Sequence, residues 1–365
     1  MFSFFSKLLN SKNKLSVSRD SNMLNEIYEQ IDIINNLINI YLSSDNNVNI
    51  NIPDNIYKFA FIASGSSYHA ATIAARYFRN FLHCESQSYY ASEFSLNEET
   101  QVDNKTLYVF ISQSGETTDT NNCLNQVSKE TDNTLAITNS ENSSLHKKAK
   151  YKILVHAGEE KSIASTKALL AQIFCLFLIA LKLLEKEEIP ALSIKEELLE
   201  IPSIIETVFN QEDKIMNFSK RISNFDNIAV LASGMFYPLA KEGALKIKET
   251  SYINANAYPT GEFLHGHIAL LNKKSAVISI INNKNVDFTV NVLTKIKMDY
   301  NAESLIISAL PFNDKSNNNL IELYTTKDIV FLFGSLVTLQ LIAYYSATFL
   351  GRNVDSPLGL TKIVK

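Results

Sequence analysis

The hydrophobic residues of this chain form runs that alternate between strand-like and helix-like spacing. Continuous apolar runs that end at turn residues predict strands buried on both faces, and they cover 57–63, 107–112, 134–139 and 151–158. Apolar residues that recur every three or four positions predict helices, and these cover 22–42, 67–82, 118–130, 143–149 and 165–186. Strands that alternate with helices predict a parallel sheet covered by helices on both faces.

The second half of the chain repeats this pattern. "FAFIASGSSYHAATIAARYF" begins at Phe59 and "IAVLASGMFYPLAKEGALKI" begins at Ile228, 169 residues later. The strand-like runs 276–281 and 305–309 keep that offset approximately. Two generic strand–helix units could look alike by coincidence, but three aligned strands favour an internal duplication of doubly wound, flavodoxin-like α/β domains with three layers.

The same pattern predicts where the domains end. A helical linker near 188–222, with two prolines, is expected between them. The boundaries that we predict are 1–44 for an N-terminal extension and helix, 45–195 for the first domain, 196–350 for the second, and 351–365 for a C-terminal tail.

Hydroxyl side chains gather where two predicted strands of the first domain end. "ASGSS" (63–67) and "SQSGETT" (112–118) each open a predicted helix. Helix N-termini carry unpaired N–H groups and a partial positive charge, and glycine lets the backbone approach an anion. Ordinary helix capping is the alternative, but a cap needs one hydroxyl, and five are available: Ser66, Ser67, Ser112, Ser114 and Thr117. The pattern favours a phosphate site, which the second half lacks because "ASGMF" and "IINNKN" stand at the equivalent places.

A second group of candidate residues is charged. Glu242, Lys246 and Glu249 are spaced by four and three, which places them on one face of a helix. A surface ladder of salt bridges would have the same spacing. The next segment, "YINANAYPTGEFLHGH", is expected to be largely non-helical and contains His265 and His267, which could move protons near neutral pH.

Composition limits the class of protein. The net charge of −4 favours neither a nucleic-acid nor a membrane surface. Cys84, Cys123 and Cys175 show neither metal-ligand nor disulfide spacing, which is typical of a cytoplasmic protein. The most apolar stretch, 168–184, is short for a membrane span and is expected to be a buried core helix.

Several long motifs, in order from Met23 to Lys365, make the chain resemble the tandem SIS (sugar isomerase) domains, in particular the isomerase half of glucosamine-6-phosphate synthase. The motifs are "NEIYEQ", "ASGSSYHA", "SQSGETTDT", "AGEEKSIASTKA", "EGALKIKETSYINANAYPTGEFLHGHIAL" and "NVDSPLGLTKIVK". In that family "SQSGET" wraps the phosphate of a hexose 6-phosphate. The resemblance implies that the phosphate is held by Ser67, Ser112, Gln113, Ser114 and Thr117, and that Ile163 and Ser165 line the sugar.

The resemblance also implies catalytic roles. Glu249 would carry the proton between C1 and C2, and Lys246 would stabilise the developing negative charge. His265 would open the sugar ring from the neighbouring subunit, so a homodimer with a shared active site is expected. Lys362 would form a Schiff base with fructose 6-phosphate. The tail around it is expected to fold over the site as an irregular strap that buries Leu358, Leu360, Ile363 and Val364, which would disfavour the charged form of a lysine near Lys246. Neither a metal nor an organic cofactor is implied.

Three positions and one domain depart from the family pattern. Leu264 replaces a lysine, His267 a proline and Leu358 an arginine, and no counterpart of the glutaminase domain is seen. The chain is therefore expected to take ammonia directly or from a separate amidotransferase subunit, or to work as a deaminase. An isomerase or deglycase for another amino-sugar or fructosamine phosphate, and a non-catalytic regulatory protein that binds sugar phosphate, are the alternatives.

Overall fold

The computed structural model shows two parallel sheets that enclose a shared layer of helices. Its fold is the α/β architecture expected from the sequence. It describes residues 21–42, 48–96, 102–186, 192–311 and 319–362.

The first half contains one sheet and the helices that alternate with its strands. Its elements are α2 (Asn22–Tyr28), α3 (Gln30–Tyr41), β1 (Lys58–Ala63), α4 (Gly65–Phe81), β2 (Glu85–Tyr90), α5 (Ala91–Leu96), β3 (Thr106–Ile111), α6 (Thr118–Val127), β4 (Thr134–Thr138), α7 (Ser144–Lys148), β5 (Tyr151–Leu154) and α8 (Lys167–Lys186).

The second half begins with two helices at the place where the sequence predicts a helical linker. Its elements are α9 (Leu192–Phe209), α10 (Glu212–Ile222), β6 (Asn227–Ala232), η1 (Gly234–Phe236), α11 (Tyr237–Ser251), β7 (Asn254–Pro259), η2 (Glu262–Leu264), η3 (His267–Leu270), β8 (Ser275–Ile281), α12 (Val286–Tyr300), β9 (Glu303–Ser308), β10 (Leu320–Glu322) and α13 (Asp328–Phe349).

Both sheets have the same strand order, which confirms the duplication. The orders are β2-β1-β3-β4-β5 and β7-β6-β8-β9-β10, and neighbouring strands of both sheets are parallel. Each strand of the second sheet begins 169 residues after its counterpart. The pairs of first residues are Lys58 and Asn227, Glu85 and Asn254, Thr106 and Ser275, Thr134 and Glu303, and Tyr151 and Leu320.

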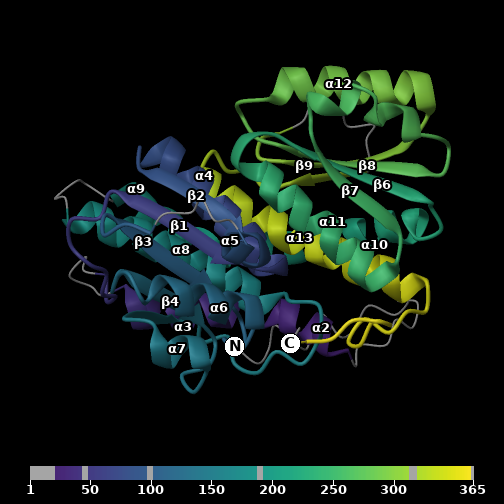
Figure 1. The fold of residues 1–365 in the computed structure, drawn as a ribbon. Helices are drawn as coiled ribbons and strands as arrows, with labels where there is room; N and C mark the ends of the chain where they lie inside the picture. The colour runs from purple at the N-terminus through teal and green to yellow at the C-terminus, as the bar shows by residue number, and fades with distance from the viewer. Residues whose placement is uncertain (1–20, 43–47, 97–101, 187–191, 312–318, 363–365) are drawn as a thin grey trace.

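The core has a large central part and smaller parts on the outer faces of the sheets, arranged as layers (Figure 1). A large central cluster joins the inner faces of both sheets to α3, α4, α8, α9, α10, α11 and α13. One smaller cluster lies under α5, α6 and α7 on the outer face of the first sheet, and another lies under α12 on the outer face of the second. Each sheet is therefore covered on both faces, as predicted, and the two halves share one apolar interior.

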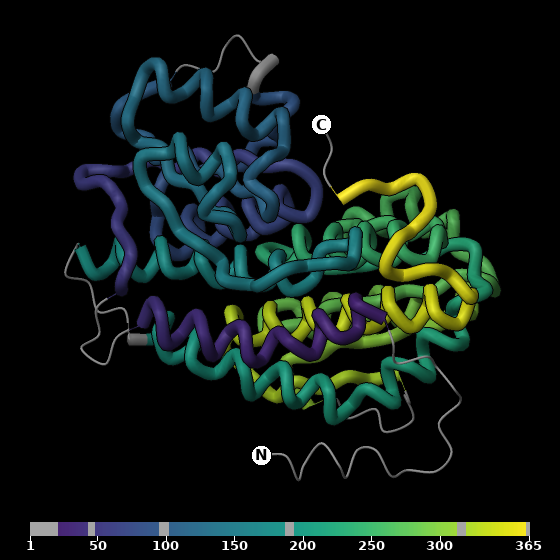
Figure 2. The backbone as a smooth tube through the Cα atoms, turned by 90° about the horizontal axis from the view of Figure 1, so that it is seen from below, coloured from purple at the N-terminus to yellow at the C-terminus, as the bar shows by residue number. Residues whose placement is uncertain are grey.

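The equivalent helices α4 and α11 pack against each other between the sheets. Figure 2 shows that α2 and α3, near the start of the described chain, run alongside α9 and α13 of the second half. Domains joined in this way cannot move freely past each other, because apolar surface would be exposed.

Two helices are apolar and long enough to cross a membrane by length and composition alone, namely α8 and α13. The share of their most apolar windows that is buried inside the protein is 78% for α8 and 100% for α13. They are core helices of this fold, as expected for 168–184.

Three strands were not expected from the sequence, and all three lie at sheet edges. β2 and β7 have the polar sequences "ESQSYY" and "NANAYP", and β10 has only three residues. An edge strand has one strand neighbour and solvent on its other side, so it needs no continuous apolar run. The helix predicted over 22–42 is also divided, because α2 ends at Tyr28 and α3 begins at Gln30.

Candidate functional site

The loop after β3 is built around a pair of hydroxyl groups. The side-chain oxygens of Ser112 and Thr117 lie 2.9 Å apart, and Ser112 Oγ accepts a hydrogen bond of 3.0 Å from the amide of Gly115. Ser114 Oγ accepts a hydrogen bond from the amide of Glu116, while the carbonyl of Gln113 accepts one from the amide of Asn139. The hydroxyls of Ser112, Ser114 and Thr117 therefore lie together in the loop that leads into α6.

The N-terminal ends of α4 and α6 are not capped by the side chains of their own N-cap residues. Ser64 and Thr117 hold those positions, and neither side chain bonds to its helix. By contrast, Ser21 and Ser143 do cap α2 and α7. Capping by the N-cap side chain therefore does not account for the hydroxyls at these two helix starts.

Gly115 is required at its position for two reasons. Its φ of +68° is a left-handed conformation that side chains rarely adopt. A Cβ atom there would lie 2.2 Å from Ser143 Oγ. The loop is further fixed by Glu116, whose two carboxylate oxygens accept hydrogen bonds of 2.8 Å from the amide and hydroxyl of Ser144.

The second hydroxyl loop lies beside the first, because β1 and β3 are neighbours that end together at Ala63 and Ile111. In the first turn of α4, Ser67 Oγ donates a hydrogen bond of 3.0 Å to Gln172 Oε1 on α8. The Ser66 side chain helps to lower the pKa of the Glu242 carboxyl on α11. The start of α4 thus links the hydroxyl loops to the charged face of α11.

The charged face of α11 is buried rather than exposed. Only 1% of the Lys246 side chain is accessible, and its ammonium group lies 3.5 Å from Glu242 Oε1 and donates a hydrogen bond to Glu249. A surface ladder is therefore excluded. Glu242 also contacts His69 of α4, with 2.6 Å between Oε2 and Nδ1.

Charge pairing overcomes burial in this group. Burial disfavours the carboxylate of Glu242, but the charge of Lys246 and the hydrogen bond with His69 outweigh it and lower its pKa. Burial also disfavours the ammonium form of Lys246, but the carboxylates of Glu242 and Glu249 raise its pKa well above the ordinary value. Both members of the Glu242–Lys246 pair are therefore charged near neutral pH.

The loop before α8 brings the C-terminal tail to the same place. Glu160 Oε1 accepts hydrogen bonds from the amides of Thr166 and Ala168 and lies 3.3 Å from Ser165 Oγ. Its other oxygen, Oε2, accepts a bond of 2.7 Å from Lys362 Nζ, which also donates to the carbonyl of Ser162. The charge of Glu160 also acts on Lys246. The tail lysine therefore lies near the charged face of α11.

The tail crosses this loop as an irregular strap, as expected. The amide of Ile163 donates to the carbonyl of Asp355, and the carboxylate of Asp355 accepts hydrogen bonds of 2.8 Å from the amides of Asn22 and Met23 at the start of α2. The buried Glu26 of α2 also fixes this loop, because its carboxylate accepts hydrogen bonds from the amide and the hydroxyl of Ser162.

Two expectations about the tail are wrong. Leu358 and Leu360 were expected to be buried, but their exposed fractions are 87% and 38%. Ile363 and Val364, expected to be buried as well, lie outside the described residues. Polar contacts hold the tail instead. Lys362 is paired with the carboxylate of Glu160, whereas a lysine without an acidic partner, near Lys246, was expected.

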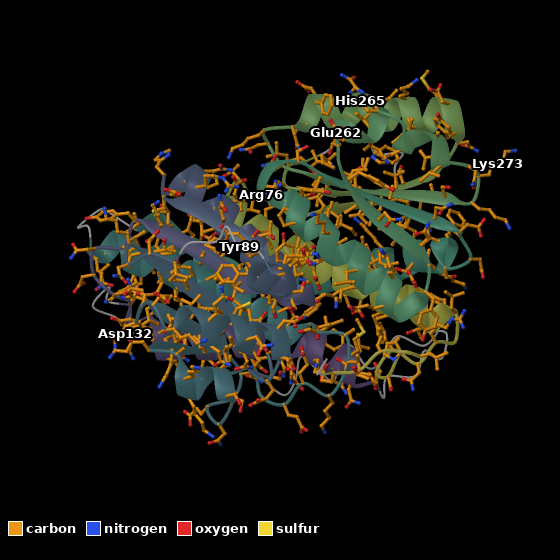
Figure 3. The ribbon with its side chains drawn as sticks, viewed as in Figure 1. Arg76, Tyr89, Asp132, Glu262, His265 and Lys273 are labelled. Carbon is orange, nitrogen blue, oxygen red and sulfur yellow. The ribbon has the colours of Figure 1, made fainter. Side chains whose placement is uncertain are left out.

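His265 is not part of this group within one chain. It follows the short helix η2 on the exposed surface of the second half. Figure 3 places His265 and Glu262 beside α12, away from Tyr89 and Arg76. Among the described residues, no hydrogen bond or ion pair joins the His265 side chain to α11.

The loop of the second half that corresponds to "SQSGET" is closed by an acid of the same chain. Asp328 accepts a hydrogen bond of 3.2 Å from Asn282 Nδ2 and pairs with Lys284 at 2.7 Å. Asp328 thus ties this loop to the start of α13, and the loop lacks the hydroxyls of its counterpart in the first half.

The structure brings most of the expected residues together at the junction between the two halves, on the first half's loops, on α11 and in the tail. The residues that sequence reasoning missed are His69, Glu160 and Gln172, and Glu242 had been given no role. His69, Glu160 and Glu242 lie inside motifs quoted above, and Gln172 does not. All four make contacts between segments far apart in the sequence, which the spacing of residues does not reveal. In the described part of the chain, no group of three or more His, Cys, Asp or Glu side chains has the arrangement of a metal site.

Comparison with known proteins adds an independent finding. The SIS domain family model matches this chain twice, over residues 55–182 and 221–350. The glutamine–fructose-6-phosphate aminotransferase [isomerizing] of Aquifex aeolicus is 30% identical over 346 residues, which are 94% of this chain and 57% of that protein. Its namesake in Bacillus licheniformis is 33% identical over 352 residues, 94% of this chain and 58% of that protein. The chain thus spans somewhat more than half the length of these relatives.

Solved structures agree with the fold. The C-terminal domain of glucosamine-fructose-6-phosphate aminotransferase from Francisella tularensis superposes with a TM-score of 0.83 at 29% identity, and covers 94% of this chain and 100% of its own. Glucosamine-6-phosphate deaminase from Thermotoga maritima gives a TM-score of 0.75 at 20% identity, with 94% and 99% covered, which shows likeness of fold alone.

Proposed function

We propose that this chain, which belongs to the SIS domain family, is an enzyme that interconverts fructose 6-phosphate plus ammonia with glucosamine 6-phosphate plus water. The observation that carries the proposal is the ion pair between the buried Lys246 and the half-buried Glu249, on a helix that packs against α4, together with hydroxyl-rich loops at two helix starts whose N-cap side chains make no capping bond. A module that only binds sugar phosphate needs the loops but not this acid and base.

The phosphate of the hexose is bound at the ends of β1 and β3. The hydroxyls of Ser112 and Thr117 and the N-termini of α4 and α6 supply donors and partial positive charge without a fixed cation. Ser67, Gln113 and Ser114 complete the cradle, with Ile163 and Ser165 beside the sugar. This arrangement predicts that unphosphorylated hexoses bind poorly.

The proton moves between C1 and C2 on the carboxylate of Glu249. Its neighbour Lys246 is held as an ammonium by two carboxylates, so it is ready to stabilise the negative charge that develops on the enediolate oxygen. This pair accounts for aldose–ketose isomerisation by acid–base chemistry.

The exchange of nitrogen requires an amine on the ketone. The amine of Lys362 attacks C2 of fructose 6-phosphate and releases water, and ammonia then displaces the lysine from the imine. Before it can attack, Lys362 must leave Glu160 and the Ser162 carbonyl and lose a proton. Glu160 is placed to take that proton.

Ring opening is assigned to His265 of a second subunit. Its exposed position on the second half is unsuited to a role in its own chain's site, but an exposed loop can reach into the site of a neighbour. We therefore propose a homodimer with shared sites, working in the cytoplasm.

The substitutions at Leu264, His267 and Leu358 favour net deamination as a second candidate function at the same site. Incubation with glucosamine 6-phosphate, with assays for ammonia and fructose 6-phosphate, tests that direction. Incubation of fructose 6-phosphate with ammonium, or with glutamine, tests synthesis and its amine source. Turnover with glutamine only after addition of a second protein would identify a separate amidotransferase subunit. Turnover of neither substrate pair, with hexose-phosphate binding intact, would overturn the proposal in favour of another amino-sugar or fructosamine phosphate, or of a regulatory role.

A further inference from the structure

A histidine of the first half makes direct contact with the charged face of the second. His69 lies one turn after the phosphate-binding start of α4, and its Nδ1 is 2.6 Å from Glu242 Oε2 on α11. Both side chains are buried. Because α4 and α11 are corresponding helices of the duplication, this contact crosses from one half to the other.

The contact fixes which ring nitrogen carries a proton. Glu242 is ionised, because its pKa lies below the ordinary value, so its oxygens accept hydrogen bonds. Nδ1 of His69 must therefore donate to Oε2. This bond leaves the other oxygen, Oε1, for Lys246, 3.5 Å away, and Oε1 has no further hydrogen bond within the described residues.

A chain of four side chains results, running from His69 through Glu242 and Lys246 to Glu249. Lysine has a long flexible stem, so its ammonium group is held in place only by its acceptors. If the carboxylate of Glu242 were free to rotate, the ammonium group of Lys246 would lose one of its two fixed partners.

We infer that His69 is a positioning residue, which orients Glu242 and thereby places the Lys246 ammonium group against Glu249. The inference rests on the proposed function, because Glu249 matters here as the proton carrier. Its consequence is that the acid–base pair is aligned only while α4 and α11 remain packed together, so the two halves of the duplication act as one catalytic unit.

Three variants test the inference by kinetics. His69→Leu removes the donor at similar volume, His69→Asn restores a side-chain N–H, and Thr72→Ala is a control one turn further along α4. For His69→Leu we expect kcat to fall on the order of 10- to 100-fold, as a misplacement of about 1 Å can cause, while KM for the sugar phosphate changes little. His69→Asn should recover part of kcat, and Thr72→Ala should match the parent protein.

A spectroscopic measurement tests the same coupling without turnover. The 15Nζ signal of Lys246, assigned by its loss in Lys246→Met, should shift in His69→Leu and return toward the parent position in His69→Asn. If the leucine variant does not fold, Glu242→Gln tests the contact from its other side and should shift the same signal. An unchanged Lys246 signal together with an unchanged kcat in a folded His69→Leu protein would overturn the inference. A parent protein without turnover would contradict the proposed function alone, since the shift could still be measured.

Discussion

Lys362 Nζ and Glu160 Oε2 lie 2.7 Å apart, although 202 positions of the sequence separate the two residues. Glu160 in turn accepts hydrogen bonds from two backbone amides at the start of α8. The tail lysine therefore rests on an acid that is itself fixed by the fold, within reach of the charged face of α11.

This position makes covalent trapping the direct test of Lys362. Borohydride in the presence of fructose 6-phosphate should reduce the imine and leave a stable adduct on Lys362, which peptide mapping would locate. Lys362→Met should give no adduct and no amine exchange. An adduct on a different lysine would reject the assignment and favour a simple isomerase. Truncation before residue 355 is a poor alternative test, because it also removes the Asp355 carboxylate from the start of α2.

The phosphate loop can be tested one hydroxyl at a time. Ser112→Ala and Thr117→Ala should each weaken binding of glucose 6-phosphate by about 1–3 kcal/mol, the range for a hydrogen bond to a charged group. Thr117→Ser keeps the hydroxyl and should bind nearly as the parent does. Isothermal titration calorimetry measures these affinities, and equal affinity of the parent for glucose and glucose 6-phosphate would show that the site is wrongly assigned.

Gly115 provides a test of the loop's backbone. Gly115→Ala should cost about 1–3 kcal/mol for its left-handed conformation alone, and the contact of the new Cβ with Ser143 adds to that cost. Urea unfolding would measure the loss. Gly359→Ala, which also has a positive φ but no atom within 4 Å of its Cβ, separates the conformational cost from the clash. Equal losses in both variants would contradict tight packing of the phosphate loop.

The buried pair on α11 predicts a pH-dependent cost of substitution. Lys246→Met leaves the Glu242 carboxylate without its cation and should destabilise the protein by about 3–5 kcal/mol at pH 7. The pKa of Glu242 is lowered below its ordinary 4.5, so its contribution is complete above that value and is lost as the pH falls through the folded-state pKa. The difference between parent and variant should therefore shrink on acidification.

Urea titrations of both proteins at pH 7 and near pH 4 would measure this change. The pKa of Lys246 in the folded protein is raised above the ordinary lysine value. The parent therefore also loses stability as the pH rises above the ordinary lysine pKa toward the raised one. Lys246→Met should not show this loss. A cost of substitution that stays constant between pH 4 and pH 7 would indicate that the pair is not buried as described.

A shared site predicts complementation between two inactive proteins. His265→Ala lacks ring opening and Glu249→Ala lacks proton transfer, so each alone should have little activity. In a mixed dimer, one of the two sites would combine an intact His265 with an intact Glu249. Activity should therefore recover after the subunits exchange. A His265→Ala and Lys246→Met mixture serves as a second pair, and no recovery after exchange shown by mass spectrometry would argue for a site within one chain.

The sequence predicted those parts of the site in which the functional residues follow the periodicity of a helix or come at the end of an apolar strand. The spacing of Glu242, Lys246 and Glu249 follows from the helical repeat, and the apolar runs of β1 and β3 predict loops that meet at one sheet edge. The edge strands β2 and β7 were not predicted, because solvent on one side removes the continuous apolar run. The partners of Glu242 and Lys362 in distant segments were not predicted either, since the contacts of His69 with Glu242 and of Lys362 with Glu160 depend on how distant helices and loops pack.

The bond from the amide of Asn22 to the carboxylate of Asp355 joins positions 333 apart in the sequence. Contacts between such distant positions form slowly and late in folding, because a very long loop must close first. During synthesis, this bond cannot form until the ribosome has made the chain past residue 355. The strap that carries Lys362 is therefore the last part of the proposed site to be assembled, so a nascent chain could bind a sugar phosphate before it is able to react with it.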